Sequence, residues 1–161
     1  KGSDIARLVQ PILDGHADVS GPDFGLDRAL DDSQLNRLYN LFDVTVLPSS
    51  GEGFGLPIIE SLAAGVPVVA TNYSACPELV RGRGELVRIL TTVTVGTNLI
   101  EQAVIDVDNL AACIEKLYQN PALVRQYSEA GLAFARSLSW DSLMPQWLQV
   151  ISSASGVELT V

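Results

Sequence analysis

The sequence has few cysteines, few basic residues and a single histidine, His16. Two cysteines in 161 residues are too few for the disulfide framework of a small secreted domain. Ten Lys and Arg stand against 19 Asp and Glu, so the formal net charge is -9. A chain this acidic lacks the positive face that nucleic acids and anionic membranes require. One histidine and two distant cysteines cannot assemble a zinc site, and we expect no metal.

Long apolar runs are also missing. The most hydrophobic stretch, residues 56–70, is broken by Glu60, Gly65 and two prolines, so we expect no transmembrane segment. The N-terminus shows no export signal, and Cys76 and Cys113 lie among apolar residues, which together favour a cytoplasmic location. The apolar fraction of 47% is sufficient for one buried core, and we predict a single domain over residues 1–161.

Helical and strand patterns alternate along the chain. A helix is predicted up to about Asp14, a loop over 15–32, and a second helix capped by Asp32-Ser33. Continuous apolar runs over 44–47 and 66–70 predict two strands buried on both faces, separated by a helix over 56–64 that ends at Gly65. Two such strands are expected to pair in parallel through a right-handed crossover, in an α/β domain.

The second half of the chain gives weaker signals. A helical turn is expected over 77–80 and a short strand over 85–87, whereas the β-branched segment 91–96 has no clear partner. Asp108 is the predicted cap of a helix that ends near Asn120-Pro121. A further helix follows, with Tyr127 and Phe134 expected in the core. The last helix is expected to point three side chains inward, namely Leu143, Trp147 and Ile151.

The most informative segment is residues 49–60, which contains glycines at 51, 53 and 55. It leaves the carboxyl end of a predicted strand, where open α/β sheets bind ligands, and enters a helix near Pro57. Glycines allow the backbone to approach a ligand closely, and a helix N-terminus carries a partial positive charge that suits phosphate. The segment therefore predicts a phosphate-binding loop.

Two glutamates flank this loop. Glu60, expected in the first helical turn, is suited to accept hydrogen bonds from vicinal hydroxyls such as those of a ribose. Glu52, on the loop itself, is suited to accept hydrogen bonds from a second polyol. Two hydrogen-bond acceptors beside a phosphate-binding loop indicate a site for a nucleotide sugar. Taken singly, a glutamate in a first helical turn more often only complements the helix dipole, and a loop glutamate is more often solvated.

Several motifs, in this order, resemble those of a known family. They are Pro48-Ser49, then Glu52-Gly53-Phe54-Gly55-Leu56-Pro57 with Glu60, then Gly65-Val66-Pro67-Val68-Val69-Ala70, Pro77-Glu78 and Gly84-Glu85-Leu86-Val87. The set is similar to the signature of retaining, nucleotide-sugar-dependent glycosyltransferases of the group 1, or family 4, type. The match is close over residues 30–87 and weak over 108–140, and we find none over 15–28 and 89–107.

The resemblance implies a Rossmann-like three-layer α/β/α domain with a parallel sheet, the C-terminal half of the two-domain GT-B fold. It implies that Glu52 is catalytic and contacts the donor sugar, and that Glu60 holds the ribose. Backbone groups of the intervening loop would contact the sugar hydroxyls and the diphosphate, at Gly53, Phe54, Gly55 and Leu56.

The resemblance also implies a partner. Family members bind the acceptor through an N-terminal domain, and they neutralise the diphosphate with an Arg and a Lys that precede the segment present here. We therefore expect a truncated donor-binding domain that does not catalyse transfer unaided. The nucleoside diphosphate sugar is the substrate, and no cofactor is expected.

Two other functions remain open at this point. Paired carboxylates also serve glycoside hydrolases, although there they stand opposed across a glycosidic bond rather than beside a glycine loop. A nucleotide-binding or interaction module that has lost catalysis is the second alternative. Binding of ADP, GDP or UDP separates the transferase from the hydrolase.

Overall fold

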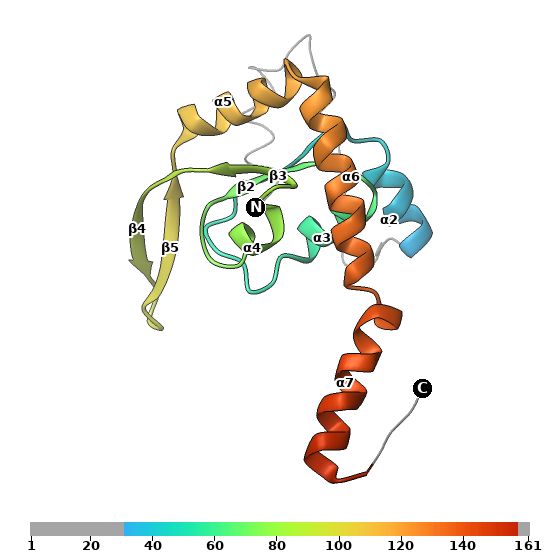
Figure 1. Cartoon of the computed structure of the whole chain (residues 1–161). Helices are drawn as coiled ribbons and strands as arrows, with labels where there is room; N and C mark the ends of the chain where they lie inside the picture. Colours follow the sequence, from blue (N-terminus) through green and yellow to red (C-terminus); the bar gives the residue numbers. More distant parts are fainter. Residues whose placement is uncertain (1–30, 158–161) are drawn as a thin grey trace. The chain divides into compact units, whose positions relative to one another are not determined.

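The computed structural model describes residues 31–157. The helix expected up to Asp14, His16 and most of the loop expected over 15–32 lie outside these residues. The described chain forms a series of helices and strands (Figure 1), namely α2 (Asp32–Tyr39), β1 (Thr45–Leu47), α3 (Leu56–Ala63), β2 (Val68–Thr71), α4 (Cys76–Val80), β3 (Gly84–Val87), β4 (Ile89–Val95), β5 (Ile100–Ile105), α5 (Val107–Tyr118), α6 (Pro121–Ser137) and α7 (Trp140–Ser155). The elements from β1 onwards belong to one compact unit, Ser33–Val161.

A parallel sheet lies at the centre of this unit. Its strand order is β1-β2-β3, and β2 pairs in parallel with both neighbours. Gly65, with a φ of 75°, ends α3 in the left-handed conformation that the sequence predicted for it. The parallel pair and the intervening helix are therefore confirmed.

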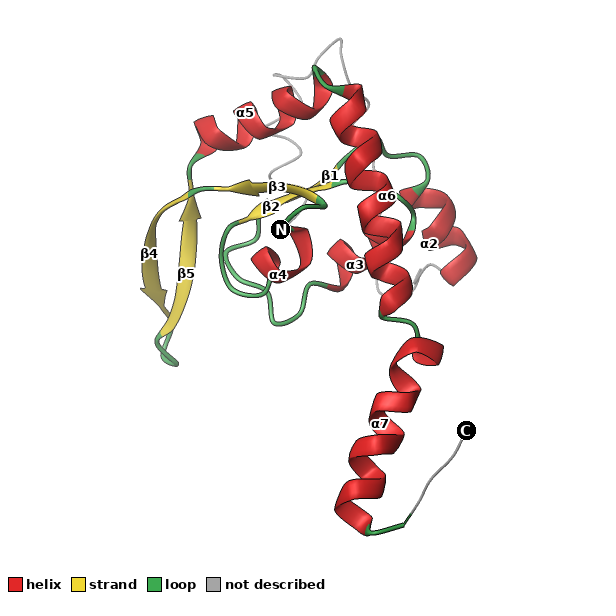
Figure 2. Ribbon diagram, viewed as in Figure 1, coloured by secondary structure: helices red, strands yellow, loops and turns green. Residues whose placement is uncertain are grey.

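The two faces of the sheet pack against different helices (Figure 2). Val68 and Ala70 of β2 pack with α3 and α4 on one face, and Val69 packs with Cys113 and Leu117 of α5 on the other. Helix α6 contributes to both clusters, with its N-terminal half on the α5 face and its last turns beside α3. The domain is thus a three-layer α/β/α structure of the Rossmann-like type, as predicted.

The prediction that both strands are buried on two faces is correct for β2 and wrong for β1. Every residue of β2 is buried, whereas Val46 in β1 is 39% exposed. The reason is position: β2 has a strand on each side, but β1 is the edge strand of the described sheet. An apolar run indicates burial without revealing whether a second neighbour is present.

The segment expected to lack a partner forms a hairpin. Strand β4 pairs in antiparallel register with β5, with Val93 opposite Gln102 and Val95 opposite Ile100. Its base is closed by Arg88 and Asp106, because the Asp106 N–H donates to the Arg88 carbonyl at 2.9 Å and the side chains form an ion pair. Along the chain the hairpin comes between β3 and α5, in the segment 89–107 where we find no family resemblance in the sequence.

The cap of α5 is also corrected. The side chain that accepts from the Asn109 N–H, at 3.0 Å, belongs to Asp106 and not to Asp108, which lies inside the first turn. The hydrogen bonds from Arg88 and from the Asn109 amide hold the pKa of the Asp106 carboxyl below its ordinary value. Asn120, expected near the end of this helix, caps the next helix, α6.

Helix α7 does not point its apolar side chains into the core. Tyr127 and Phe134 of α6 pack against the two core clusters, as expected. Trp147 and Ile151 are instead 55% and 45% exposed, and α7 has no buried residue. Within residues 31–157 no helix is both long and apolar enough to cross a bilayer.

Candidate functional site

The glycine-rich loop lies at the carboxyl edge of the parallel sheet. It leaves β1 after Leu47 and enters α3 at Leu56. The segment after β2, residues 72–75, leaves the same edge because β1 and β2 run parallel. Of the predicted site residues, Glu52, Gly53, Phe54 and Gly55 are on the loop, and α3 carries the other two. Carboxyl ends of parallel strands are where α/β folds place their ligand sites.

The loop is held in place through its carbonyl groups. The Thr71 hydroxyl donates to the Ser49 carbonyl at 2.7 Å, and the Ala103 N–H of the hairpin donates to the Ser50 carbonyl at 2.8 Å. Across the described residues, every backbone hydrogen bond of residues 49–55 uses a loop carbonyl as the acceptor. Within residues 31–157 the anchoring therefore uses acceptors of the loop, and no loop N–H group, the donor that an anion needs, donates to another described residue.

A third anchor comes from a strained residue. Ser74 is not a glycine but has a φ of 54°, and its hydroxyl donates to the Glu52 carbonyl at 2.6 Å. A left-handed non-glycine residue persists only where its surroundings hold it in place, and such residues are enriched at functional sites. No pattern in the sequence indicates the contacts of Ser74, Thr71 or Ala103 with the loop.

The glycines differ in why the fold needs them. Gly55 has a φ of 92° as the N-cap of α3, and a Cβ there would lie 3.1 Å from Ile58 Cδ1 and 3.2 Å from Leu79 Cδ1. Gly53 has no positive φ, and a Cβ there would meet no described atom within 4 Å. Gly55 is therefore required by the fold. Gly53 is not, and it leaves open space beside the backbone.

The N-terminus of α3 has no side-chain cap, and its second residue is Pro57. Because Gly55 sets the start of the helix at Leu56, Glu60 is the fifth helical residue, and the first turn contains no acidic side chain. The expectation that Glu60 lies in the first turn is therefore wrong. Its carboxylate still leans back toward the N-terminus, as helical side chains do.

The contacts of Glu60 are with α2. Its Oε2 accepts a hydrogen bond from the Tyr39 hydroxyl at 3.0 Å, and the same hydroxyl contacts the Pro57 carbonyl at 3.3 Å. Burial, followed by the hydrogen bond and the charge of Glu60, raises the pKa of Tyr39 to about 12. In the sequence Tyr39 belongs to the apolar stripe of the helix capped by Asp32-Ser33 and to a Leu38-Tyr39 pair that resembles the family, but neither pattern indicates this contact, which joins residues 21 positions apart.

The charge of Glu52 acts on a different element, α4, through Cys76. Burial raises the pKa of the Cys76 thiol, and the nearby negative charge of Glu52 adds to the effect. Within residues 31–157 no hydrogen bond joins the Glu52 and Glu60 carboxylates, and no group of three or more His, Cys, Asp or Glu side chains is placed to hold a metal ion. Phe54 and Leu56, beside these glutamates, are 53% and 63% exposed.

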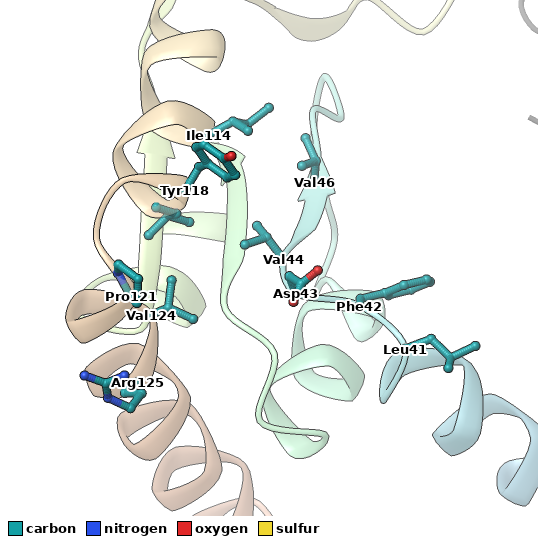
Figure 3. A pocket seen from close by; sticks show the side chains of 11 residues that line it. Leu41, Phe42, Asp43, Val44, Val46, Ile114, Tyr118, Pro121, Val124 and Arg125 are labelled. Atoms are coloured by element: carbon teal, nitrogen blue, oxygen red, sulfur yellow. The ribbon is translucent and has the colours of Figure 1, made fainter. Parts of the chain in front are cut away.

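An apolar groove of about 780 Å³ lies elsewhere on the domain (Figure 3). Val46 of β1 and Val44, which precedes the strand, face Ile114 and Tyr118 of α5 across it. None of the predicted site residues lines this groove. Its walls are the side of the edge strand and two helices, whereas the glycine-rich loop is at the strand ends.

Comparisons with known proteins identify the family of the chain. Residues 28–134 match the family model described as glycosyl transferases group 1. The chain is 33% identical over 126 residues to an MMP alpha-(1->4)-mannosyltransferase of Mycolicibacterium hassiacum, covering 78% of this chain and 28% of that protein. It is 32% identical over 120 residues to a D-inositol 3-phosphate glycosyltransferase of Thermomonospora curvata, covering 74% and 25%.

A solved structure is similar over nearly the whole chain. Sucrose-phosphate synthase of Thermosynechococcus elongatus superposes with a TM-score of 0.66 and 25% identity, covering 96% of this chain and 34% of that one. The chain thus spans about a quarter to a third of the length of these proteins. Sequence and structure agree that this chain belongs to the glycosyl transferases group 1 family and has the architecture of a GT-B glycosyltransferase domain.

Proposed function

We propose that the chain is the donor-binding domain of a retaining glycosyltransferase, which moves a sugar from a nucleoside diphosphate sugar to an acceptor. The observation that carries the proposal is the anchoring of residues 49–55 through their carbonyls, which leaves N–H groups at an uncapped helix N-terminus. Donors fixed in this way suit a diphosphate and require no metal ion or cofactor. The open side of Gly53 supports close approach of the ligand.

In this proposal the two glutamates have separate roles. Glu52, on the loop, contacts the donor sugar beside the reacting carbon and is the catalytic residue. Glu60, on α3, accepts hydrogen bonds from the ribose hydroxyls. The loop backbone at Gly53, Phe54 and Gly55, with Leu56 at the start of the helix, binds the sugar and the diphosphate. The Glu60 carboxylate accepts a hydrogen bond from Tyr39 of α2, whereas the charge of Glu52 acts on Cys76 of α4, and this difference in surroundings supports separate roles.

Chemistry also requires neutralisation of the leaving diphosphate, which develops negative charge as the glycosidic bond breaks. Among the described residues, the cation that directly follows a strand of the parallel sheet is Arg88, and it is paired with Asp106. We therefore propose that the cations belong to the first strand and helix of this same domain, upstream of the segment present here, and that the acceptor site belongs to an N-terminal partner domain. The 161-residue chain would bind donor weakly and would not turn it over.

Calorimetric titration of the chain with ADP, GDP and UDP tests donor binding. We expect saturable binding of at least one nucleotide, weakened by Glu60→Gln. Glu129→Gln is a matched control, because it removes the same charge from an exposed position on α6. Binding of an oligosaccharide without any response to nucleotides would favour a hydrolase and overturn the proposal.

Turnover in the full-length protein tests the two roles. Glu60→Ala should raise the KM for the donor with a small effect on kcat, and Glu52→Gln should mainly lower kcat. NMR of the first product formed should show the anomeric configuration of the donor. An inverted product, or full activity in both variants, would contradict the assignment, as would turnover by the isolated chain.

A further inference from the structure

Tyr39 is the last residue of α2, and its hydroxyl reaches the first turns of α3 beside the proposed ribose-binding glutamate. It is 9% exposed, and its ring contacts Phe42 edge to face, with centroids 5.8 Å apart. The hydroxyl is directed at two oxygens of α3, the Glu60 Oε2 at 3.0 Å and the Pro57 carbonyl at 3.3 Å. A buried ring therefore brings a single polar atom to the carboxylate of Glu60.

The direction of this hydrogen bond is fixed by chemistry. A carbonyl and a carboxylate can only accept, so the Tyr39 hydroxyl must donate. With a pKa of about 12, the hydroxyl keeps its proton throughout the neutral range. Tyr39 thus occupies one lone pair of Oε2. Among the described residues Glu60 shows no other side-chain hydrogen bond, so Oε1 is left for other donors.

We infer that Tyr39 is a positioning residue, which holds the Glu60 carboxylate in the orientation that receives the two vicinal hydroxyls of the donor ribose. The inference rests on the proposed function. A free glutamate samples several rotamers and must be immobilised on binding, whereas one already held by a fixed donor loses less entropy. Tyr39 itself touches no ligand, because its hydroxyl is committed to α3.

A purely structural role is the alternative, because the same bond ties α2 to α3. Tyr39→Phe separates the two. It keeps the ring and its contact with Phe42 and removes only the hydroxyl. A structural loss would weaken every nucleotide alike, whereas loss of positioning would weaken only ligands whose ribose carries hydroxyls. Tyr118→Phe is the matched control, because Tyr118 is 79% exposed on α5.

The experiment measures the Kd of the nucleotide that binds, among ADP, GDP and UDP, and of its 2′,3′-dideoxy counterpart. For Tyr39→Phe we expect the ribonucleotide Kd to rise about five- to tenfold, the size of effect typical of one net hydrogen bond. The dideoxynucleotide Kd should not change, and Tyr118→Phe should leave both unchanged. In a Glu60→Gln background, Tyr39→Phe should add little.

The outcomes separate this inference from the proposed function. If the wild-type chain binds no nucleotide, both fail. If Glu60→Gln abolishes the preference for the ribonucleotide but Tyr39→Phe preserves it, only the role of Tyr39 is wrong. Equal weakening of both nucleotides by Tyr39→Phe, with a lower melting temperature, would assign Tyr39 a structural role and overturn the inference.

Discussion

Two glycines of the same loop should respond in opposite ways to one added methyl group. Gly55→Ala places a side chain at a φ of 92° and brings its Cβ within 3.1 Å of Ile58 and 3.2 Å of Leu79. Gly53→Ala adds a Cβ that meets no described atom within 4 Å, at a backbone conformation without positive φ. The first change should destabilise the fold, and the second should affect only what binds beside the loop.

The magnitudes follow from these conformations. An L-residue in the left-handed region costs roughly 1–2 kcal/mol, to which the two tight contacts add. In a domain of this size, about 1 kcal/mol shifts the melting temperature by roughly 2–4 °C. Gly55→Ala should therefore lower it by at least about 2–8 °C. Gly53→Ala should leave the melting temperature unchanged or raise it slightly. Alanine reduces the conformational entropy of the unfolded chain, which can stabilise the folded state by up to about 1 kcal/mol.

Differential scanning fluorimetry and nucleotide titration of the two variants provide the test. Gly53→Ala should fold normally yet raise the nucleotide Kd by about tenfold or more, because its methyl group occupies space needed by the ligand. If Gly53→Ala binds nucleotide like the wild type, the loop does not approach the ligand there. If Gly55→Ala melts like the wild type, the left-handed cap of α3 is misassigned.

Three further predictions concern stability. The pKa of the Asp106 carboxyl is lowered in the folded state, so its contribution to stability is complete above the ordinary value of 3.8 and is lost as the pH falls below that value. Denaturation at pH 7 and at pH 3 should therefore show a smaller loss of unfolding free energy for Asp106→Asn than for the wild type. Leu117→Ala should lower the free energy of unfolding by about 2–5 kcal/mol, and Trp147→Ala by less than about 0.5 kcal/mol, in urea titrations. Ser74→Ala should destabilise more than Ser74→Gly, because only glycine relieves the positive φ, while both lose the bond to the loop; equal melting temperatures would contradict this.

The centre of the fold could be predicted because its sequence signals are local. The apolar run of β2 and the period of α3 each lie within a few residues, and Gly65 marks the end of the helix. The wrong expectation that Val46 is buried came from the same kind of local signal, the apolar run of its strand. Apolarity reports the tendency of a strand to be buried, but whether a neighbouring element covers it depends on distant parts of the chain.

The hairpin escaped prediction for physical reasons. A register shift between Ile89 and Thr91 breaks the alternation by which a strand is recognised. The turn lacks the Asn-Gly signal of short hairpins and uses Gly96 and Leu99, with φ values of 72° and 51°. A leucine at a positive φ is not a turn signal in sequence. Its conformation is imposed by the pairing of β4 with β5.

The positions of the candidate residues, on the loop and on α3, could be predicted from the sequence, but the contacts that fix the loop could not. The loop is fixed by Thr71 at the end of β2, by Ser74 before α4 and by the backbone N–H of Ala103 in the hairpin. Thr71 and Ser74 act through side-chain hydroxyls, which residues at many positions could supply. Ala103 acts through its backbone N–H, which every residue except proline carries. All three residues donate to backbone carbonyls of the loop, and every residue carries such a carbonyl. The amino-acid sequence of the loop therefore does not indicate these partners. A change in the hairpin or after β2 can therefore alter the loop without touching the motif.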